Sequence, residues 1–241
     1  MFFFKQLNKN YFIYFILIFV FIPLNYIPQI FDGVYINYAL ETGNVRTIDF
    51  WYKDASRYIH FFIIDIIDIL SKNTFIPAEI LLDNLAILVL ILFCFEVKKY
   101  SKLLFGLEER WCRLAALFAA IFPVWHILVA INISQYLFSI YCVLFGYRNF
   151  IKNKKTKIFF GFIFIILSFE VESNLSFIVG LALVHLILNK IHKLNHTSAS
   201  KFITIIIICF VYYLLKTSYL PTEGYFEEYN QLKWDHIKFS L

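Results

Sequence analysis

The first polar stretch of the chain brings together residue types that can recognise and activate hydroxyl groups. Residues 29–44, QIFDGVYINYALETGN, contain Asp32 and Tyr35, and the polar stretch continues through Asp54 to Arg57. A carboxylate can remove the proton from an attacking hydroxyl group, and a cation can stabilise a departing phosphate. Acids and aromatic rings together could line a pocket for a sugar.

Two of these residues also have a purely structural interpretation. Asp32 lies where a helix would begin and Gly43 where it would end, so the Asp32 carboxylate could accept a hydrogen bond from a backbone N–H of that helix. Arg57 could anchor the chain at a membrane surface by extending its guanidinium toward lipid headgroups. The residue types alone leave both interpretations open.

The composition of the chain indicates which secondary-structure elements hold these residues in place. The 241 residues are 61% hydrophobic and 21% aromatic, only 16% are charged, and the mean hydropathy is +0.70. Soluble domains carry more charge and fewer apolar residues. Apolar runs recur along the whole chain, which predicts an all-α polytopic transmembrane bundle with about seven spans, at residues 11–28, 77–97, 111–131, 133–149, 158–169, 174–189 and 202–217.

The distribution of lysine and arginine orients these spans. With a cytoplasmic N-terminus, fifteen of the 22 basic residues fall on the cytoplasmic side, in agreement with the positive-inside rule. This holds only if residues 57–72 do not span. Their polar side chains cover one arc of a helix and their large apolar side chains the other, so we expect an interfacial helix inside an external loop, residues 28–76. Residues 218–241 would form an external tail of this multi-pass protein of the inner or plasma membrane.

The fifth and sixth apolar segments are short for a full span, and they meet at SFEVESN, residues 168–174. We therefore expect their turn to lie below the outer membrane surface. A carboxylate at that depth is unfavourable unless it faces a polar cavity, which makes Glu170 or Glu172 a candidate site residue.

The other polar residues indicate neither a metal site nor nucleic-acid binding. The four cysteines lie in apolar segments without the spacing of metal ligands, and His126 and His185 have no second ligand at metal spacing. The lysines cluster beside membrane helices, where topology explains them. No internal repeat or flexible linker divides the chain, so we expect one integral membrane domain, residues 1–241, without a cofactor.

Several stretches follow one another in an order that matches a known family. They are FDGVYINYALETG after the first helix, WYKDASRY before the interfacial helix, the long run AALFAAIFPVWHILVAINISQYLFSIYCVLFGY, and LSFEVESNLSF. This layout, over about residues 10–217, resembles the N-terminal half of the GT-C superfamily of membrane glycosyltransferases. The branch it resembles most includes the protein O-mannosyltransferases and related bacterial enzymes that use lipid-linked sugars.

The resemblance implies a reaction and roles for particular residues. Such enzymes move a sugar from a polyprenyl-phosphate donor to a saccharide or protein acceptor on the extracytoplasmic face. By position, Asp32 would be the catalytic base and Arg57 would hold the donor phosphate. Glu172 matches the acid in the turn between two short helices of the family and would orient a group in the cavity, while Tyr35 and Asp54 would contact the donor.

Two other functions remain open on the sequence. The chain could be a transporter or flippase for a lipid-linked saccharide, in which the same acids line a passage and charged residues extend through the depth of the bundle. It could also be a non-catalytic subunit or a fragment of a larger membrane assembly, which would co-purify with a stoichiometric partner.

Overall fold

The structure, a computed structural model, describes residues 38–43, 48, 52, 57–121, 134–152, 154–171, 173–192 and 199–219. The predicted first span and residues 220–241 of the predicted tail lie outside these ranges. So do four of the candidate site residues: Asp32, Tyr35, Asp54 and Glu172. Arg57 and Glu170 are described, and the site can be built from them.

The described residues are helical and contain no strand, as the composition predicts. The main helices are α5 (Tyr58–Thr74), α6 (Ala78–Phe105), α7 (Glu109–Ile121), α9 (Ser134–Phe150), α10 (Lys155–Ser168), α11 (Ser173–His192) and α12 (Ala199–Tyr219). Three segments are long and apolar enough to cross a bilayer, namely Ala78–Phe105, Asn174–Ile191 and Ala199–Tyr219. The described part of the chain is therefore all-α, with three helices suited to a membrane, and spans beyond these three stay a prediction.

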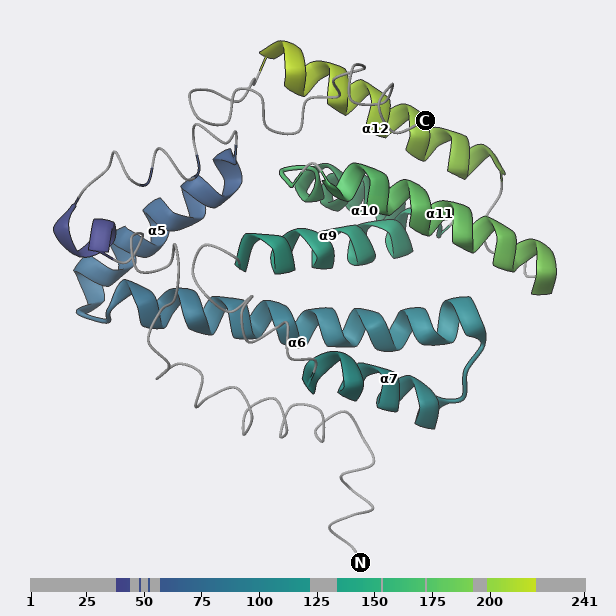
Figure 1. Cartoon of the computed structure of the whole chain (residues 1–241), viewed down its shortest axis with the longest axis horizontal. Coiled ribbons are helices and arrows are strands. Elements are labelled where there is room, and N and C mark those ends of the chain that lie inside the picture. Colours follow the sequence, from purple (N-terminus) through teal and green to yellow (C-terminus); the bar gives the residue numbers. More distant parts are fainter. Residues whose placement is uncertain are drawn as a thin grey trace, which may run out of the picture.

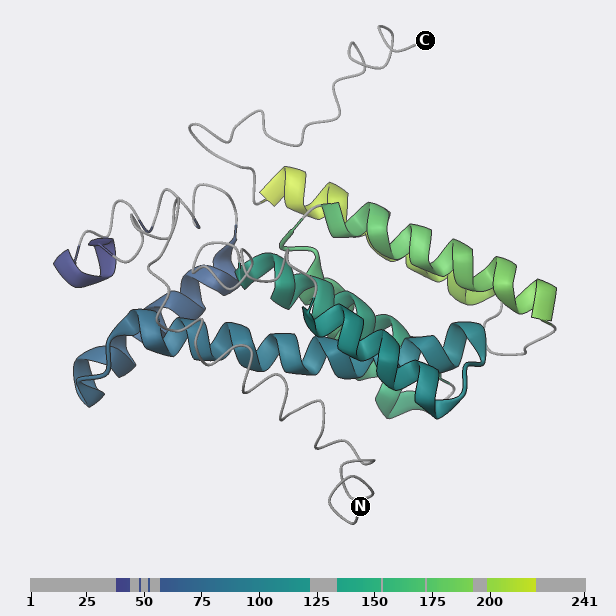
Figure 2. The same cartoon turned by 60° about the horizontal axis from the view of Figure 1, so that its bottom comes forward.

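The helices pack as a bundle with α6 and α7 along one side and α12 along the other (Figure 1). α9, α10 and α11 lie between them, and a view turned by 60° shows α12 running beside α11 (Figure 2). One hydrophobic core joins these helices. Its fully buried members include Leu90, Leu137, Ile165, Ile178 and Ile205, each from a different helix. Such a core excludes water and lipid from the centre of the bundle.

Two glycines allow α9 and α10 to approach very closely. A Cβ on Gly161 would lie 2.4 Å from the backbone nitrogen of Phe150, and one on Gly146 would lie 2.8 Å from that of Ile165. Both neighbours are backbone atoms, which cannot swing away as a side chain could. Small residues at such crossings let helices in a membrane gain van der Waals contact, so this glycine pair sets the distance and register of α9 and α10.

The outer surface of the bundle is apolar. α12 buries Ile205, Cys209 and Lys216, whereas Ile203, Phe210 and other large side chains on its remaining faces are exposed. A water-soluble protein rarely exposes so large a continuous apolar surface. Contact with lipid acyl chains accounts for it without any further protein layer.

Helix α5 has the amphipathic division that the sequence predicts, with one change. Its large apolar side chains Phe62 and Ile69 are exposed on one side, and Asp65 is exposed as well. The opposite side packs on the bundle through Ile64, Ile67 and His60. His60, one of the polar side chains of this helix, is buried, and the carboxylate of Glu170 binds it.

The described part of the first loop agrees with one further expectation. Residues 38–42 are helical and Gly43 follows with φ +68°, a left-handed conformation that ends helices and that glycine adopts without strain. The expected cap at the start of that helix, Asp32, lies outside the described residues.

Candidate functional site

Three segments from distant parts of the sequence meet at one end of the bundle. They are the first turn of α5, the first turns of α9, and the turn between α10 and α11, and both views place them together (Figures 1 and 2). Their polar residues form what we call the Glu170 cluster: Tyr52, Arg57, His60, Tyr136 and Glu170.

Glu170 binds the beginning of helix α5. Its Oε1 accepts hydrogen bonds from the backbone N–H groups of Ile59 at 2.6 Å and His60 at 3.0 Å. Its Oε2 lies 2.5 Å from Nδ1 of His60, which donates to the carboxylate. The first N–H groups of a helix lack partners within the helix and carry partial positive charge, so a carboxylate is a favourable ligand for them. Glu170 thus caps α5 from more than a hundred residues away.

The turn that carries Glu170 is fixed by its own hydrogen bonds. α10 ends at Ser168, whose hydroxyl donates to the carbonyl oxygen of Ile165, 2.6 Å away. The side chain of Asn174, in the first turn of α11, donates back to the carbonyl oxygen of Ser168 at 2.9 Å, and its backbone N–H donates to Val171. Ser168, Glu170 and Asn174 are all buried. The described residues of this turn are therefore held inside the protein by polar contacts.

Arg57 lies just before α5 and contacts helix α9. Its Nη2 donates to the hydroxyl oxygen of Tyr136 at 3.3 Å, and its guanidinium carbon lies 5.6 Å from the centre of the Tyr136 ring. Guanidinium has five N–H donors, and within the described residues Arg57 forms no ion pair with a carboxylate. Its contacts within the described residues are therefore those with Tyr136.

The charges of Arg57 and Glu170 both act on the hydroxyl of Tyr52. Its side chain is buried, and burial raises the pKa of its hydroxyl well above the usual value. The charge of Arg57 opposes this rise in pKa, and the charge of Glu170 adds to it. Tyr52 stays protonated and can donate a hydrogen bond.

Helix α9 adds two buried polar groups one turn apart on one face. The side chains of Gln135 and Ser139 are almost completely buried, yet Gln135 Oε1 and Ser139 Oγ have no hydrogen-bond partner among the described residues. Unsatisfied buried groups of this kind are rare because they lose hydration without replacement. A bound hydroxyl group would satisfy either of them.

Helix α12 closes the same end of the bundle. The Tyr212 ring packs against Phe169, the neighbour of Glu170, with the ring centres 5.0 Å apart. One turn further on, the buried Lys216 brings a second cation toward this end.

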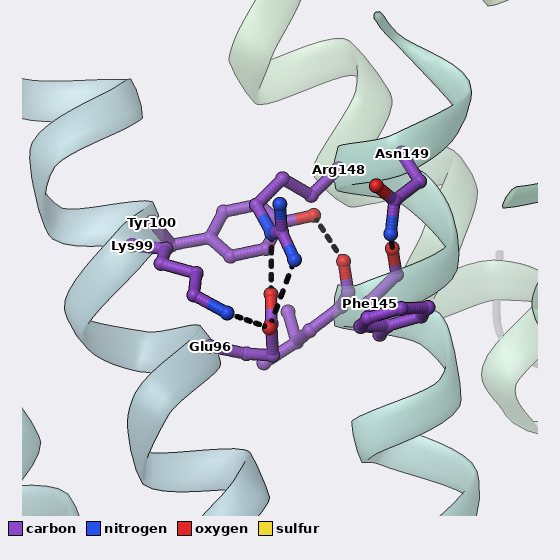
Figure 3. Close-up of polar contacts among 7 residues, drawn as sticks. Glu96, Lys99, Tyr100, Phe145, Arg148 and Asn149 are labelled. Atoms are coloured by element: carbon purple, nitrogen blue, oxygen red, sulfur yellow. Dashed lines mark hydrogen bonds and ion pairs between the residues drawn. The ribbon is translucent and has the colours of Figure 1, made fainter. Parts of the chain in front are cut away.

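A second polar cluster lies at the opposite end of α9 (Figure 3). Glu96 of α6 is buried, and its two oxygens accept from Arg148 Nε at 2.5 Å and Arg148 Nη2 at 3.0 Å. Lys99 adds a third contact to Glu96 at 2.7 Å. Beside this ion pair, the hydroxyl of Tyr100 donates to the carbonyl oxygen of Leu144 at 2.8 Å. This arrangement satisfies every charge it buries and ties α6 to α9.

Comparison with known proteins gives no relative. No protein-family model matches the chain, and neither the curated proteins nor the solved structures contain a significant match. Functional inference therefore depends on the residues and their geometry. Among the described residues, no three His, Cys, Asp or Glu side chains gather as a metal site would require.

The structure describes two of the candidate site residues, Arg57 and Glu170, and does not describe the others. It brings Arg57 to the same end of the bundle as the SFEVESN turn, and it points Glu170 inward. Glu172, which the sequence analysis preferred over Glu170, lies outside the described residues together with Asp32, Tyr35 and Asp54. Sequence reasoning missed His60 as the partner of Glu170. Its signal was the single imidazole among the first residues of an amphipathic helix, a position that also suits a solvent-exposed residue.

Proposed function

We propose that the protein is a membrane glycosyltransferase of the GT-C type, which moves a sugar from a polyprenyl-phosphate donor to an acceptor on the extracytoplasmic face. One observation carries the proposal. The Arg57 guanidinium, a buried carboxylate and two buried acceptor groups of α9 that have no partner among the described residues lie at one end of an apolar bundle. A phosphate that enters from the lipid with a sugar attached needs this combination of a cation and hydroxyl-binding groups.

The transfer reaction distributes its steps over these residues. Asp32 accepts the proton of the acceptor hydroxyl while that oxygen forms a bond to the anomeric carbon of the sugar. The bond between the anomeric carbon and the phosphate oxygen breaks, and polyprenyl phosphate leaves with the electron pair. Attack from the opposite side inverts the configuration. Arg57 stabilises the charge that develops on the phosphate, in a setting shielded from water where such interactions are strong.

The other residues of the site act on binding and position. Gln135 and Ser139 accept hydrogen bonds from sugar hydroxyls, and Tyr35, Asp54 and Glu172 complete the donor pocket. Glu170 and His60 hold the first turn of α5, and with it Arg57, in place. Glu170 already accepts three hydrogen bonds, so it serves as a positioning residue and leaves proton abstraction to Asp32.

The direct test is sugar transfer by purified protein in liposomes. A panel of polyprenyl-phosphate sugars is offered with saccharide and peptide acceptors, and transfer is followed by mass spectrometry. Asp32→Asn should lower the rate by about 10²- to 10⁴-fold, because it removes the base but keeps the shape of the side chain. Glu41→Gln, a change of an exposed acid in the same loop, is the matched control. Inactivity of the wild type with the whole panel, or equal rates for Asp32→Asn and wild type, would contradict the proposal.

A specific observation keeps a transporter of lipid-linked saccharide as a second candidate. Asp83 and Glu96, two acids at different depths of α6, are both buried in the bundle. Acids that face the interior are typical of a polar passage. Glu96, however, is fully neutralised by Arg148 and Lys99, which suits a fixed contact between helices better than a passage. Translocation of a fluorescent lipid-linked sugar across vesicles, retained in Asp32→Asn, would favour the transporter. Co-purification of a stoichiometric partner would instead favour a subunit role.

A further inference from the structure

A group of cations surrounds the turn between α9 and α10, at the end of the bundle remote from the Glu170 cluster. We call it the basic turn. Its members are Arg148 at the end of α9, Lys152 in the turn, Lys154, Lys155 and Lys157 at the start of α10, and Lys201 in the first turn of α12.

Contacts bring these cations close together. Lys201 Nζ donates to the carbonyl oxygen of Ile151, next to Lys152. Lys152 lies in the turn and Lys157 in the first turn of α10, and their ammonium groups repel each other. Burial lowers the pKa of Lys152, and the charges of Arg148 and Lys157 lower it further. Within the part of the chain that the structure describes, positive charges therefore outnumber negative charges around the basic turn.

The start of α10 adds further positive charge to the basic turn. Lys154 occupies the N-cap position without a side-chain hydrogen bond, and the first turn contains no acid. Lysines at the positive end of a helix dipole are unfavourable unless an anion is present. Glu96 is the one described acid in contact with Arg148, and it already accepts from both Arg148 and Lys99.

Exposed aromatic rings continue directly from the lysines. Phe159 and Phe160, half a turn to one turn beyond Lys157, are 61% and 55% exposed. Lysines next to exposed rings on the surface of a membrane bundle match a molecule with a phosphate at one end and hydrocarbon at the other. A free phosphate would use the lysines alone.

We propose that the basic turn binds the headgroup of an anionic phospholipid, with the phosphate between Lys152 and Lys157 and an acyl chain along Phe159 and Phe160. This site is separate from the proposed sugar-transfer site and does not depend on it. Bound lipid would hold the α9–α10 turn against α12 and orient this end of the protein toward the leaflet that is richer in anionic lipid.

The test measures lipid binding to the full-length protein by native mass spectrometry and by thermal unfolding in micelles. Phosphatidylglycerol and phosphatidylcholine with identical acyl chains are titrated, with inorganic phosphate as a separate arm. Each Lys near an anionic surface contributes about 1 kcal/mol, and 1.4 kcal/mol is a tenfold change in affinity. Lys152→Gln/Lys157→Gln should therefore weaken phosphatidylglycerol binding on the order of 25-fold, and either single change about fivefold.

The control variant removes the same charge elsewhere at this end of the bundle. Lys102→Gln/Lys190→Gln alters two exposed lysines outside the basic turn and should change the affinity by less than about threefold. Lys152→Arg/Lys157→Arg keeps the charge and should keep binding. Unchanged binding in Lys152→Gln/Lys157→Gln, an equal loss in the control, or equal stabilisation of wild type by inorganic phosphate would each overturn the proposal. If the double variant fails to fold, the two single variants decide.

Discussion

Replacing Gly161 by alanine tests the central packing contact of the bundle. The new methyl group would lie 2.4 Å from the backbone nitrogen of Phe150 and 2.8 Å from both Phe150 Cα and the carbonyl oxygen of Gly146. Ordinary contacts of a Cβ begin near 3.4 Å, so α9 and α10 must separate locally by about 1.0 Å. Backbone atoms surround the methyl group, and no rotamer change can relieve the clash.

The free energy of unfolding should fall by a predictable amount. Overpacking of a well-packed interior costs about 1–3 kcal/mol, and a gap of about 0.5–1 Å forfeits a quarter to a half of each van der Waals contact along the crossing. Alanine is a better helix former than glycine by about 1 kcal/mol, which offsets part of this. Gly180→Ala receives the same propensity gain on α11 with nothing within 4 Å of the new Cβ. The propensity gain is the same in both variants and cancels, so they should differ by the overpacking cost, about 1–3 kcal/mol.

The assay is unfolding in detergent micelles, monitored by intrinsic fluorescence, with wild type, Gly180→Ala, Gly146→Ala and Gly161→Ala compared. Among the variants, Gly180→Ala should be the most stable, Gly146→Ala less stable and Gly161→Ala the least stable. The reason is that the shortest distance from the new Cβ to another atom is 2.8 Å at Gly146 and 2.4 Å at Gly161. If Gly161→Ala is as stable as Gly180→Ala, the close crossing of α9 and α10 does not exist and the register derived from it is wrong.

Two further predictions concern the buried carboxylates. Glu96→Gln should destabilise the protein by about 3 kcal/mol because Arg148 is left without its counter-charge. Glu96→Leu/Arg148→Met, which removes both charges, should recover stability to within about 1 kcal/mol of wild type. Thermal unfolding of the variants distinguishes these outcomes. Glu170→Ala should lower stability by about 2–4 kcal/mol and speed hydrogen exchange in α5, because the buried His60 and two backbone N–H groups lose their acceptor. Glu170→Gln keeps one carbonyl oxygen as an acceptor and should lower stability less.

The fold class was predictable because the bilayer restricts the choices. Apolar runs of sufficient length become helices, and the runs at 77–97, 174–189 and 202–217 correspond to α6, α11 and α12. Their ends were less predictable: α6 continues to Phe105, eight residues beyond the expected end, since lysines extend a helix as readily as leucine does. The composition indicates where the hydrocarbon core of the membrane ends, but a helix can continue beyond that boundary.

The candidate site was predictable in its location and less so in its contacts. The shortness of the fifth apolar segment, which forms the 14-residue α10, indicated that a carboxylate of SFEVESN would be drawn inward, and Glu170 is buried. The expectation that the sixth segment is also too short was wrong, because it forms the 20-residue α11, which is long enough to cross a bilayer. The partner could not be predicted, because Glu170 binds backbone N–H groups, which every residue possesses except proline. The close approach of Gly146 and Gly161 was equally hidden, since spacing along the chain does not reveal which helices cross.

The contacts at the two ends of α9 depend on one another through the glycine crossing. Glu96 binds Arg148 near the last turn of α9, and α10 carries the turn that places Glu170 near its first turns. A helix rises 1.5 Å per residue, so a slip of α10 by one residue along α9 would move Glu170 by about that distance. Its hydrogen bonds to Ile59 and His60, now 2.6 and 3.0 Å, would then exceed 4 Å if the slip is directed away from them, and α5 would lose its cap. The position of Arg57 therefore depends on the packing of Gly146 against Gly161, and Gly161→Ala should weaken the anion binding proposed for Arg57 as well as lower stability.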